Sequence, residues 1–530
     1  MKISSKTFYL KDNRAMRKKV LTLLNVILFA GFAHAGQNPI YENLPTGKYT
    51  VGFKIITITD SSRVIAPEYN YLGEKNAGDR FKKITIHVWY PAKANTGKRN
   101  ITYGEYCYND LLTSTDETLP AERINSVLSS RRGSVRQWFG DASDELWKQL
   151  TDAQLLARAN ATFLPEKFPL LIGMLRPLST SITNEMLASN GYVVAMVKSS
   201  TLYRAPLGST EEISDMQHVM AHIVNTFKID EEKIGTFGFS GSGFSQVLLA
   251  MYDYRIKAVA DLESGIYMEG LYQLFSASNY YEPSRLKIPF LHAFSRDLSK
   301  QEKYFEDFER KTIFSERYHL LLNQPGLHHW DFAAEGYTSC IALKNRGADQ
   351  SNFQKSFELT NIYLLNFFNA KLKADQNAQM FLTDKPSLSK IPSAIWNIQI
   401  RKGVRPAPNG TEFEDIIRSK GIAAAMDIVN STLINDSTTN LRQWVVLNNL
   451  GSNFLLEKKY DESIQVFKLN VQIHPDDANL WDSLAEGYEA TGDKENTKKA
   501  SQQVLDLLNK KPSLTNPEKS LKETAERRLK

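Results

Sequence analysis

The central part of the chain, from residue 168 to residue 322, alternates short apolar runs with amphipathic segments. Runs in which nearly every position is apolar are typical of strands buried on both faces of a parallel sheet. Segments with apolar residues three and four positions apart are typical of helices that cover such a sheet. The expected strands are 169–174, 192–197, 234–239, 256–260, 288–294 and 318–322, and the expected helices are 183–190, 213–227 and 244–252. The alternation predicts an α/β fold with a mostly parallel sheet and helices on both faces.

The preceding region has a different pattern. Residues 49–58 are rich in β-branched and aromatic side chains, and residues 84–90 alternate and stop at Pro91, which has no ladder donor. These two segments predict an antiparallel start to the sheet, with a turn expected at 60–63.

Residues 100–160 are more polar and are expected to be helical, with a break at Ser130-Arg131-Arg132-Gly133. We expect this segment to be an insertion or lid on the domain that contains the sheet.

The tail is expected to be helical throughout, and residues 446–510 carry a period of 34. The matching pairs are Leu447 and Trp481, Leu450 and Leu484, Gly451 and Ala485, and Phe454 and Tyr488. This period and its Leu-Gly…Tyr/Phe…Pro pattern resemble the tetratricopeptide repeat. Two repeats bury little core alone, so we expect the tail, residues 401–530, to dock on the rest of the chain or on a protein partner. An interaction module and a structural appendix are equally compatible with the pattern.

The N-terminus has the three parts of a secretory signal peptide. Arg17, Lys18 and Lys19 precede an apolar run over 20–33, which ends in Ala33-His34-Ala35. Residues 1–35 are therefore expected to be a cleaved leader, with Met16 the more typical start. No later segment has the length and apolarity of a membrane span, so we expect an exported protein, periplasmic or secreted, without a stable span after cleavage.

Composition limits the classes of function. The chain has 530 residues, of which 42% are hydrophobic and 23% charged, and these values are typical of a globular protein of two or three domains. The net charge of +6 is small, and no dense basic block occurs after the leader, so no nucleic-acid partner is expected. Cys107 and Cys340 are too few for a disulfide framework or a cysteine zinc site. They form either one disulfide or two buried thiols, and the second is slightly favoured.

The segment Gly238-Phe239-Ser240-Gly241-Ser242-Gly243 follows an expected strand and opens an expected helix. This is the context of a nucleophile elbow, in which a serine sits on a strained strand-to-helix turn. Ser240 is the expected nucleophile, and the N–H of Gly241 is one expected oxyanion donor. The usual G-x-S-x-G pattern has Ser242 in place of its last glycine, which is a mild departure. No lysine follows the glycines, which argues against a phosphate-binding loop.

A triad on this fold runs in the order serine, acid, histidine. His328 and His329 follow the last expected strand, in a loop where the general base belongs, and His329 is preferred. His292 and His319 lie inside expected strands and are interpreted as packing residues. His474 lies in the repeats.

Three carboxylates compete for the role of the acid that orients the base. Asp261 and Glu263 follow the strand after the elbow, and Asp297 follows the next strand. Spacing alone leaves all three open.

Several segments, taken in order, resemble the platelet-activating-factor acetylhydrolase and dienelactone-hydrolase-like branch of α/β-hydrolases. Residues 51–63 carry Gly…Asp-x-x-Arg, residues 86–92 end in Trp-Tyr-Pro-Ala, and residues 187–194 read Leu-Ala-Ser-Asn-Gly-Tyr-Val-Val. The elbow resembles the branch's Gly-His-Ser-x-Gly-Gly, and residues 329–332 its His-x-x-Phe. Together these matches span residues 50–335.

The resemblance implies hydrolysis of small carboxylic esters through an acyl-enzyme, with no metal and no cofactor. It places Glu263 in the position of the acid, with Asp297 in reserve. It also reveals a departure, because the branch's His-Gly after the first buried strand is absent here. Pro177 has no N–H to donate, so Leu175 or Arg176 is expected to supply the second oxyanion amide.

The sequence therefore predicts an exported serine esterase with an α/β-hydrolase domain over residues 36–400. A hydrolase-fold scaffold that presents the repeats and a serine peptidase on the same fold remain alternatives. Trp330, beside the expected base, is a candidate for lining an apolar acyl pocket.

Overall fold

The computed structural model describes residues 39–94, 97–174, 177–198, 208–295, 302–344, 349–384, 388 and 391–530. The chain divides into two compact units, with the boundary between Gly403 and Val404. The sequence-based boundary lies between residues 400 and 401. The expected leader, residues 1–35, lies outside the described residues.

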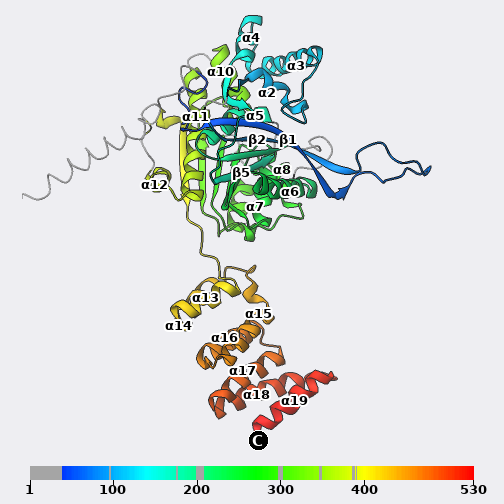
Figure 1. The fold of residues 1–530 in the computed structure, drawn as a ribbon. Helices are drawn as coiled ribbons and strands as arrows, with labels where there is room; N and C mark the ends of the chain where they lie inside the picture. Colours follow the sequence, from blue (N-terminus) through cyan, green and yellow to red (C-terminus); the bar gives the residue numbers. More distant parts are fainter. Residues whose placement is uncertain are drawn as a thin grey trace, which may run out of the picture. The chain divides into compact units, whose positions relative to one another are not determined.

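Within the described residues, the first unit is built on one sheet of eleven strands in the order β11-β10-β9-β8-β7-β5-β6-β2-β1-β4-β3. Figure 1 shows the sheet with helices packed around it. Strands β5 to β10 run parallel to their neighbours within that group, whereas β2 pairs antiparallel with both β1 and β6, and β11 pairs antiparallel with β10. The strands are β1 (Thr50–Val64), β2 (Phe81–Ala92), β3 (Asn100–Thr102), β4 (Gln154–Ala159), β5 (Phe168–Met174), β6 (Val193–Val197), β7 (Ile229–Phe239), β8 (Ile256–Leu262), β9 (Phe290–Ser295), β10 (Arg317–Leu322) and β11 (Trp396–Arg401).

Helices cover both faces of this sheet. The α-helices of the first unit are α2 (Tyr103–Tyr108), α3 (Ala121–Phe139), α4 (Asp144–Asp152), α5 (Pro177–Ser189), α6 (Thr210–Thr226), α7 (Ser242–Tyr252), α8 (Glu269–Ser276), α9 (Glu302–Lys311), α10 (Ala334–Leu343), α11 (Gln350–Leu372) and α12 (Gln376–Asp384). The short 3₁₀ helices are η1 (Asn109–Leu111), η2 (Pro283–Arg285), η4 (His329–Phe332) and η6 (Ser393–Ile395). The predicted α/β class is confirmed.

Side chains at alternate positions of the central strands pack into two separate hydrophobic cores, one on each face of the sheet. Leu171 and Phe237 belong to a core shared with α5, α10 and α11. Leu170 and Val259 belong to a second core shared with α6, α7 and α9. Because side chains alternate along a strand, each central strand is apolar on both faces, which explains its continuous hydrophobic run.

The expected turn at 60–63 is wrong, because β1 continues through it to Val64. Two ion pairs to the buried Asp215 carboxylate of α6 stabilise this extension: Arg63 lies 2.6 Å from it, and Lys82 of β2 lies 2.9 Å from it. Tertiary ion pairing therefore overrides the local polar signal.

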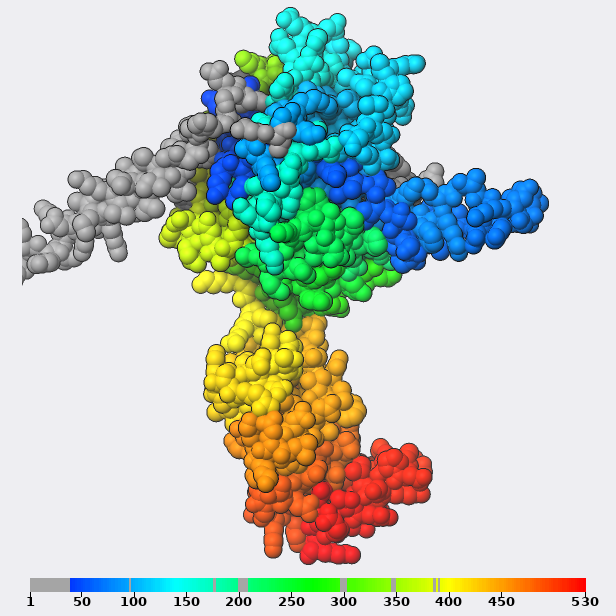
Figure 2. Space-filling view, viewed as in Figure 1, coloured from blue at the N-terminus to red at the C-terminus, as the bar shows by residue number. Residues whose placement is uncertain are grey.

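Beyond this point the hairpin of β1 and β2 ends in an arm, residues 65–80, which projects from the sheet (Figures 1 and 2). The Asn70 side chain accepts from the N–H groups of Leu72 and Glu74 and fixes the turn at the tip. Tyr71 is 97% exposed and Leu72 is 70% exposed.

Residues 100–160 differ from the expectation in two ways. They include strands β3 and β4, and β4 extends the sheet by pairing parallel with β1. Helix α3 also runs unbroken through Ser130-Arg131-Arg132-Gly133, so the expected break is wrong. One glycine in a helix interior costs only about 1 kcal/mol relative to alanine, which a long helix tolerates.

Cys107 of α2 and Cys340 of α10 are both buried thiols, so they do not form a disulfide. Burial raises the pKa of the Cys107 thiol to about 12. Such a thiol stays protonated and acts as a small core residue.

The second unit consists of helices only, in the order α13 (Gly410–Lys420), α14 (Ile422–Thr432), η7 (Asn440–Arg442), α15 (Trp444–Leu456), α16 (Tyr460–Ile473), α17 (Ala478–Thr491), α18 (Lys494–Leu508) and α19 (Asn516–Leu529). Helices α17 and α18 begin 34 residues after α15 and α16 respectively (478 − 444 and 494 − 460). Phe467 fills the space above Gly451 at the α15–α16 crossing, where an added Cβ would lie 2.5 Å from its ring. The tetratricopeptide assignment itself stays a prediction.

None of the helices in the described part of the chain has both the length and the apolar character that crossing a membrane requires.

Candidate functional site

Ser240 lies on the tight connection between β7 and α7. Its backbone is left-handed, with φ 59°, a conformation that non-glycine residues rarely adopt. Its N–H donates to Leu262 O at 2.9 Å, and its carbonyl accepts from Gly243 N at 2.8 Å. Neighbouring backbone groups therefore hold a strained serine at the carboxyl end of the sheet, as the predicted nucleophile elbow requires.

Two glycines make this turn possible. A Cβ on Gly238 would lie 2.8 Å from Ser242, and a Cβ on Gly243 would lie 2.2 Å from Asp261 Oδ1. Contacts this short would push the strand and helix apart. Ser242 fits in place of the usual glycine because its hydroxyl donates to Phe239 O at 2.8 Å.

The loop after β10 brings His329 to Ser240. His329 Nε2 lies 2.8 Å from Ser240 Oγ, within hydrogen-bond distance. Its ring stacks on Phe239, with centroids 4.8 Å apart and 25° between the planes. Trp330 packs edge-on against the same ring at 5.6 Å. Phe239, which precedes the predicted nucleophile, thus packs against the predicted base and orients its ring, although the sequence pattern had indicated no role for Phe239.

Burial lowers the pKa of the His329 imidazole below its ordinary value of 6.5. A neutral ring that carries its proton on Nδ1 presents a lone pair on Nε2. The ring is therefore able to accept the Ser240 proton at neutral pH.

His328, the alternative base, has an exposed side chain. Its backbone N–H donates to Asp331 Oδ2 at 2.7 Å, which caps η4 and fixes the turn that presents His329. Of the two loop histidines, the structure brings His329 to Ser240.

Glu263, the preferred acid, immediately follows β8, beside the elbow. It shares the left-handed backbone of Ser240, with φ 53°, and is 5% exposed. Its carboxylate accepts from the Ser295 N–H at 2.7 Å and from the Ser295 hydroxyl at 2.9 Å. A strained, buried carboxylate beside a nucleophile is the kind of residue that functional sites retain.

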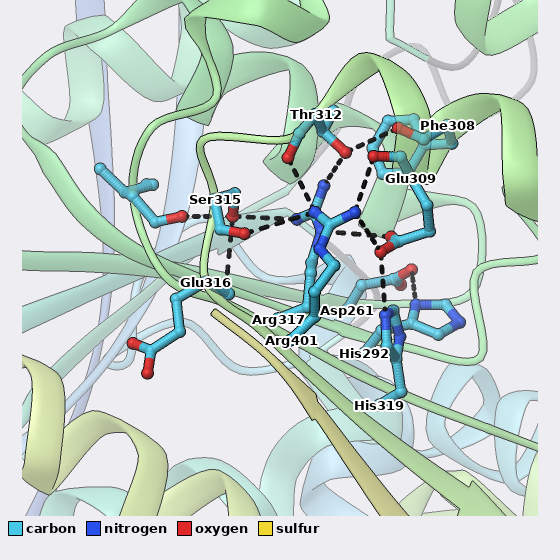
Figure 3. Close-up of polar contacts among 11 residues, drawn as sticks. Asp261, His292, Phe308, Glu309, Thr312, Ser315, Glu316, Arg317, His319 and Arg401 are labelled. Carbon is cyan, nitrogen blue, oxygen red and sulfur yellow. Dashed lines mark hydrogen bonds and ion pairs between the residues drawn. The ribbon is translucent and has the colours of Figure 1, made fainter. Parts of the chain in front are cut away.

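Asp261, the second candidate acid, lies within β8 and is fully buried. Its Oδ2 lies 2.8 Å from His292 Nδ1 of β9 (Figure 3). The same oxygen accepts from the Ser264 hydroxyl at 2.5 Å. Asp261 therefore pairs with His292. The third candidate, Asp297, lies outside the described residues.

Gly241, the expected oxyanion donor, is the residue between Ser240 and the first turn of α7. Within the described part of the chain its N–H has no hydrogen-bond acceptor, so it is available to a bound oxyanion. The other expected donors, Leu175 and Arg176, lie outside the described residues. No group of three histidine, cysteine or carboxylate side chains that could hold a metal ion occurs among the described residues.

The order of strands, the elbow after β7 and the histidine after β10 make up the α/β-hydrolase fold predicted from the sequence. No family model matches the chain. No curated protein matches it either. Among solved structures, the chain is similar to a ferulic acid esterase from Streptomyces cinnamoneus, with 18% sequence identity and a TM-score of 0.46, over 67% of this chain and 98% of that chain. The resemblance to a particular hydrolase branch, drawn from the motifs, stays a prediction.

Proposed function

We propose that this chain is a serine hydrolase that cleaves carboxylic esters through an acyl-enzyme. The observation that carries the proposal is the 2.8 Å contact between Ser240 Oγ and His329 Nε2, on a serine with a left-handed backbone. A hydroxyl becomes a nucleophile at neutral pH when a positioned base takes its proton as it attacks.

In the first step, the Ser240 hydroxyl gives its proton to His329 Nε2 as Oγ bonds to the ester carbonyl carbon. The carbonyl π electrons move to oxygen, where the Gly241 N–H stabilises the negative charge, and Leu175 or Arg176 supplies a second amide. The intermediate collapses, the bond from carbon to the alkoxy oxygen breaks, and His329 returns the proton to the leaving alcohol. Water then repeats these steps on the acyl-enzyme and releases the acid.

Glu263 is the acid of this proposal. It lies at the end of the strand next to the elbow, it is buried, and its backbone is strained as that of Ser240 is. Its charge would stabilise the imidazolium that forms when His329 accepts the proton.

A fluorophosphonate probe tests the proposal directly, because the Ser240 oxygen would displace fluoride from phosphorus and become covalently labelled. We expect labelling of the wild-type protein and none of Ser240→Ala. Ser242→Ala is the matched control: it removes a neighbouring hydroxyl whose proton is engaged by Phe239 O, and it should be labelled. A folded wild-type protein that takes no label would contradict the proposal and favour the scaffold.

Substrate panels separate an esterase from a peptidase. We expect turnover of small aryl and alkyl esters and no turnover of matching amides. Faster cleavage of peptides than of esters would replace the esterase with the peptidase alternative.

Export is part of the proposal and rests on the leader motif in the sequence. The N-terminal residue of the protein from the native host tests it. Processing after Ala35 is expected to leave Gly36 as the first residue, and an unprocessed chain in the cytosol would contradict export.

A further inference from the structure

Three polar residues lie in a row across the neighbouring strands β8, β9 and β10, beside the elbow. Gly238 of β7 is in register with Asp261 of β8, Asp261 with His292 of β9, and His292 with His319 of β10. Registered positions in adjacent strands point to the same face of a sheet. Here that face is the one covered by α7 and α9. Helix α7, which begins two residues after Ser240, packs on β7 and β8, so Asp261 is the member of the row that lies under this helix.

Its members are among the most buried polar groups of the unit. Asp261 and His292 are 0% exposed and His319 is 5% exposed. Figure 3 shows Asp261 against His292, and His319, Arg317 and Arg401 gathered on Glu309. A buried carboxylate is costly unless charge and hydrogen bonds compensate it, so such a pair fixes positions firmly once it forms.

The carboxylate of Asp261 touches the elbow itself. A Cβ on Gly243 would lie 2.2 Å from Asp261 Oδ1, so the first turn of α7 rests on this oxygen. Within the described residues, Oδ1 has no hydrogen-bond donor, whereas Oδ2 lies 2.8 Å from His292 Nδ1 and accepts a hydrogen bond from the Ser264 hydroxyl. The free oxygen thus faces the amino-terminal end of α7, where a negative charge is favoured by the helix dipole.

We infer that the Asp261–His292 pair is a positioning unit, which holds the amino-terminal turn of α7 and thereby the left-handed backbone of Ser240. It acts through the elbow and does not contact substrate. The inference rests on the proposed function, because the elbow geometry matters for rate only if Ser240 is the nucleophile. Misplacing a reacting group by about 1 Å can cost on the order of 100-fold in rate, even when the substituted residue is remote from the chemistry.

Asp261→Asn tests the unit, because it keeps the shape of the side chain and removes its charge. We expect the rate of fluorophosphonate labelling at Ser240 and kcat for an ester to fall together by about 10-fold, with KM changed by less than about twofold. A role limited to overall stability would leave both rates of the folded protein unchanged.

Asp253→Asn is the matched control at the opposite end of the same helix. Asp253 caps α7 and pairs with Arg255 at 2.6 Å, and it is 5% exposed. This variant should lose stability and keep the labelling rate of the wild type. Equal rate losses in Asp253→Asn and Asp261→Asn would overturn the inference.

Ser264→Ala provides a second route if Asp261→Asn does not fold. It removes one hydrogen bond to the Asp261 carboxylate and leaves the charge in place. We expect a smaller loss in the same two rates, and a wild-type rate in this variant would overturn the inference.

A crystal structure of the variant separates the inference from the proposed function. If the wild-type protein takes no label, the proposed function fails. The positioning role of Asp261 can still be tested in that case, because its readout is the backbone φ angle of residue 240. A relaxed, negative φ at residue 240 in Asp261→Asn supports positioning, and a φ that stays near the wild-type 59° rejects it.

Discussion

His329 and His292 each make a polar contact of 2.8 Å, yet their surroundings differ in every other respect. His329 lies on a loop, is half-buried and faces a hydroxyl. His292 lies within a central strand, is 0% exposed and faces a carboxylate. Distance alone therefore does not separate the histidine proposed to move a proton from the one proposed to hold the structure. The two histidines are separated by the chemistry of the group that each contacts, a hydroxyl or a carboxylate, and by access to substrate.

Replacing His329 gives the largest expected effect. His329→Gln removes the base and should lower kcat/KM for an ester by about 10⁴-fold, while the free energy of unfolding changes by less than about 1 kcal/mol. Steady-state kinetics with denaturant unfolding of the same preparation checks both values. Retention of activity within 10-fold of the wild type would end the contrast between the two histidines.

Replacing His292 should instead have a large effect on stability and a smaller effect on activity. His292→Gln leaves the Asp261 carboxylate buried without its partner and should lower the free energy of unfolding by about 3 kcal/mol. The folded fraction should keep about a tenth of the wild-type kcat, because the elbow loses its support. Urea unfolding gives the stability. A loss of activity as large as that of His329→Gln would place His292 in the reaction itself.

The pH dependence of kcat/KM sharpens the comparison. Burial lowers the pKa of His329, and only the neutral ring is a base. The rate should therefore fall about 10-fold per pH unit below that pKa and level off above it. We expect a midpoint below the ordinary histidine value of 6.5. Trp330→Ala admits water to the ring and should move the midpoint upward. A wild-type midpoint above 7 would show that another group controls the rate.

His328→Gln has the smallest expected effect. Its side chain is exposed, and its backbone N–H, which the substitution retains, makes the contact that caps η4. Activity should stay within about twofold of the wild type. The free energy of unfolding should change by less than about 0.5 kcal/mol, as for other exposed positions. A large loss of activity in this variant would move the general base from residue 329 to its neighbour.

Local sequence signals predicted those residues of the candidate site whose positions depend on local structure. The elbow could be predicted because a serine among glycines between a buried strand and a helix has few other uses. His329 could be predicted from its place after the last parallel strand. Strand β11 was missed although Trp396, Ile398 and Ile400 alternate with polar residues, a period-two signal that was present in the sequence.

Other features depend on contacts that no local signal carries. The extension of β1 through Arg63 requires Asp215, which lies far away in the chain. Asp261 was weighed as a triad acid and His292 was interpreted as packing, and only the register of β8 with β9 shows that the two residues pair. Glycine at 243 is explained by the same pairing, because it makes room for Asp261.

The arm at residues 65–80 has a practical consequence. At its tip Gly73 has φ 79°, and no atom lies within 4 Å of an added Cβ, so an inserted peptide or a fluorophore would meet nothing there. A protease that cuts at this tip would leave two fragments. The antiparallel hydrogen-bond ladder between β1 and β2 would still hold them together. Such a nicked protein offers a route to reassembling the chain from two separately expressed fragments.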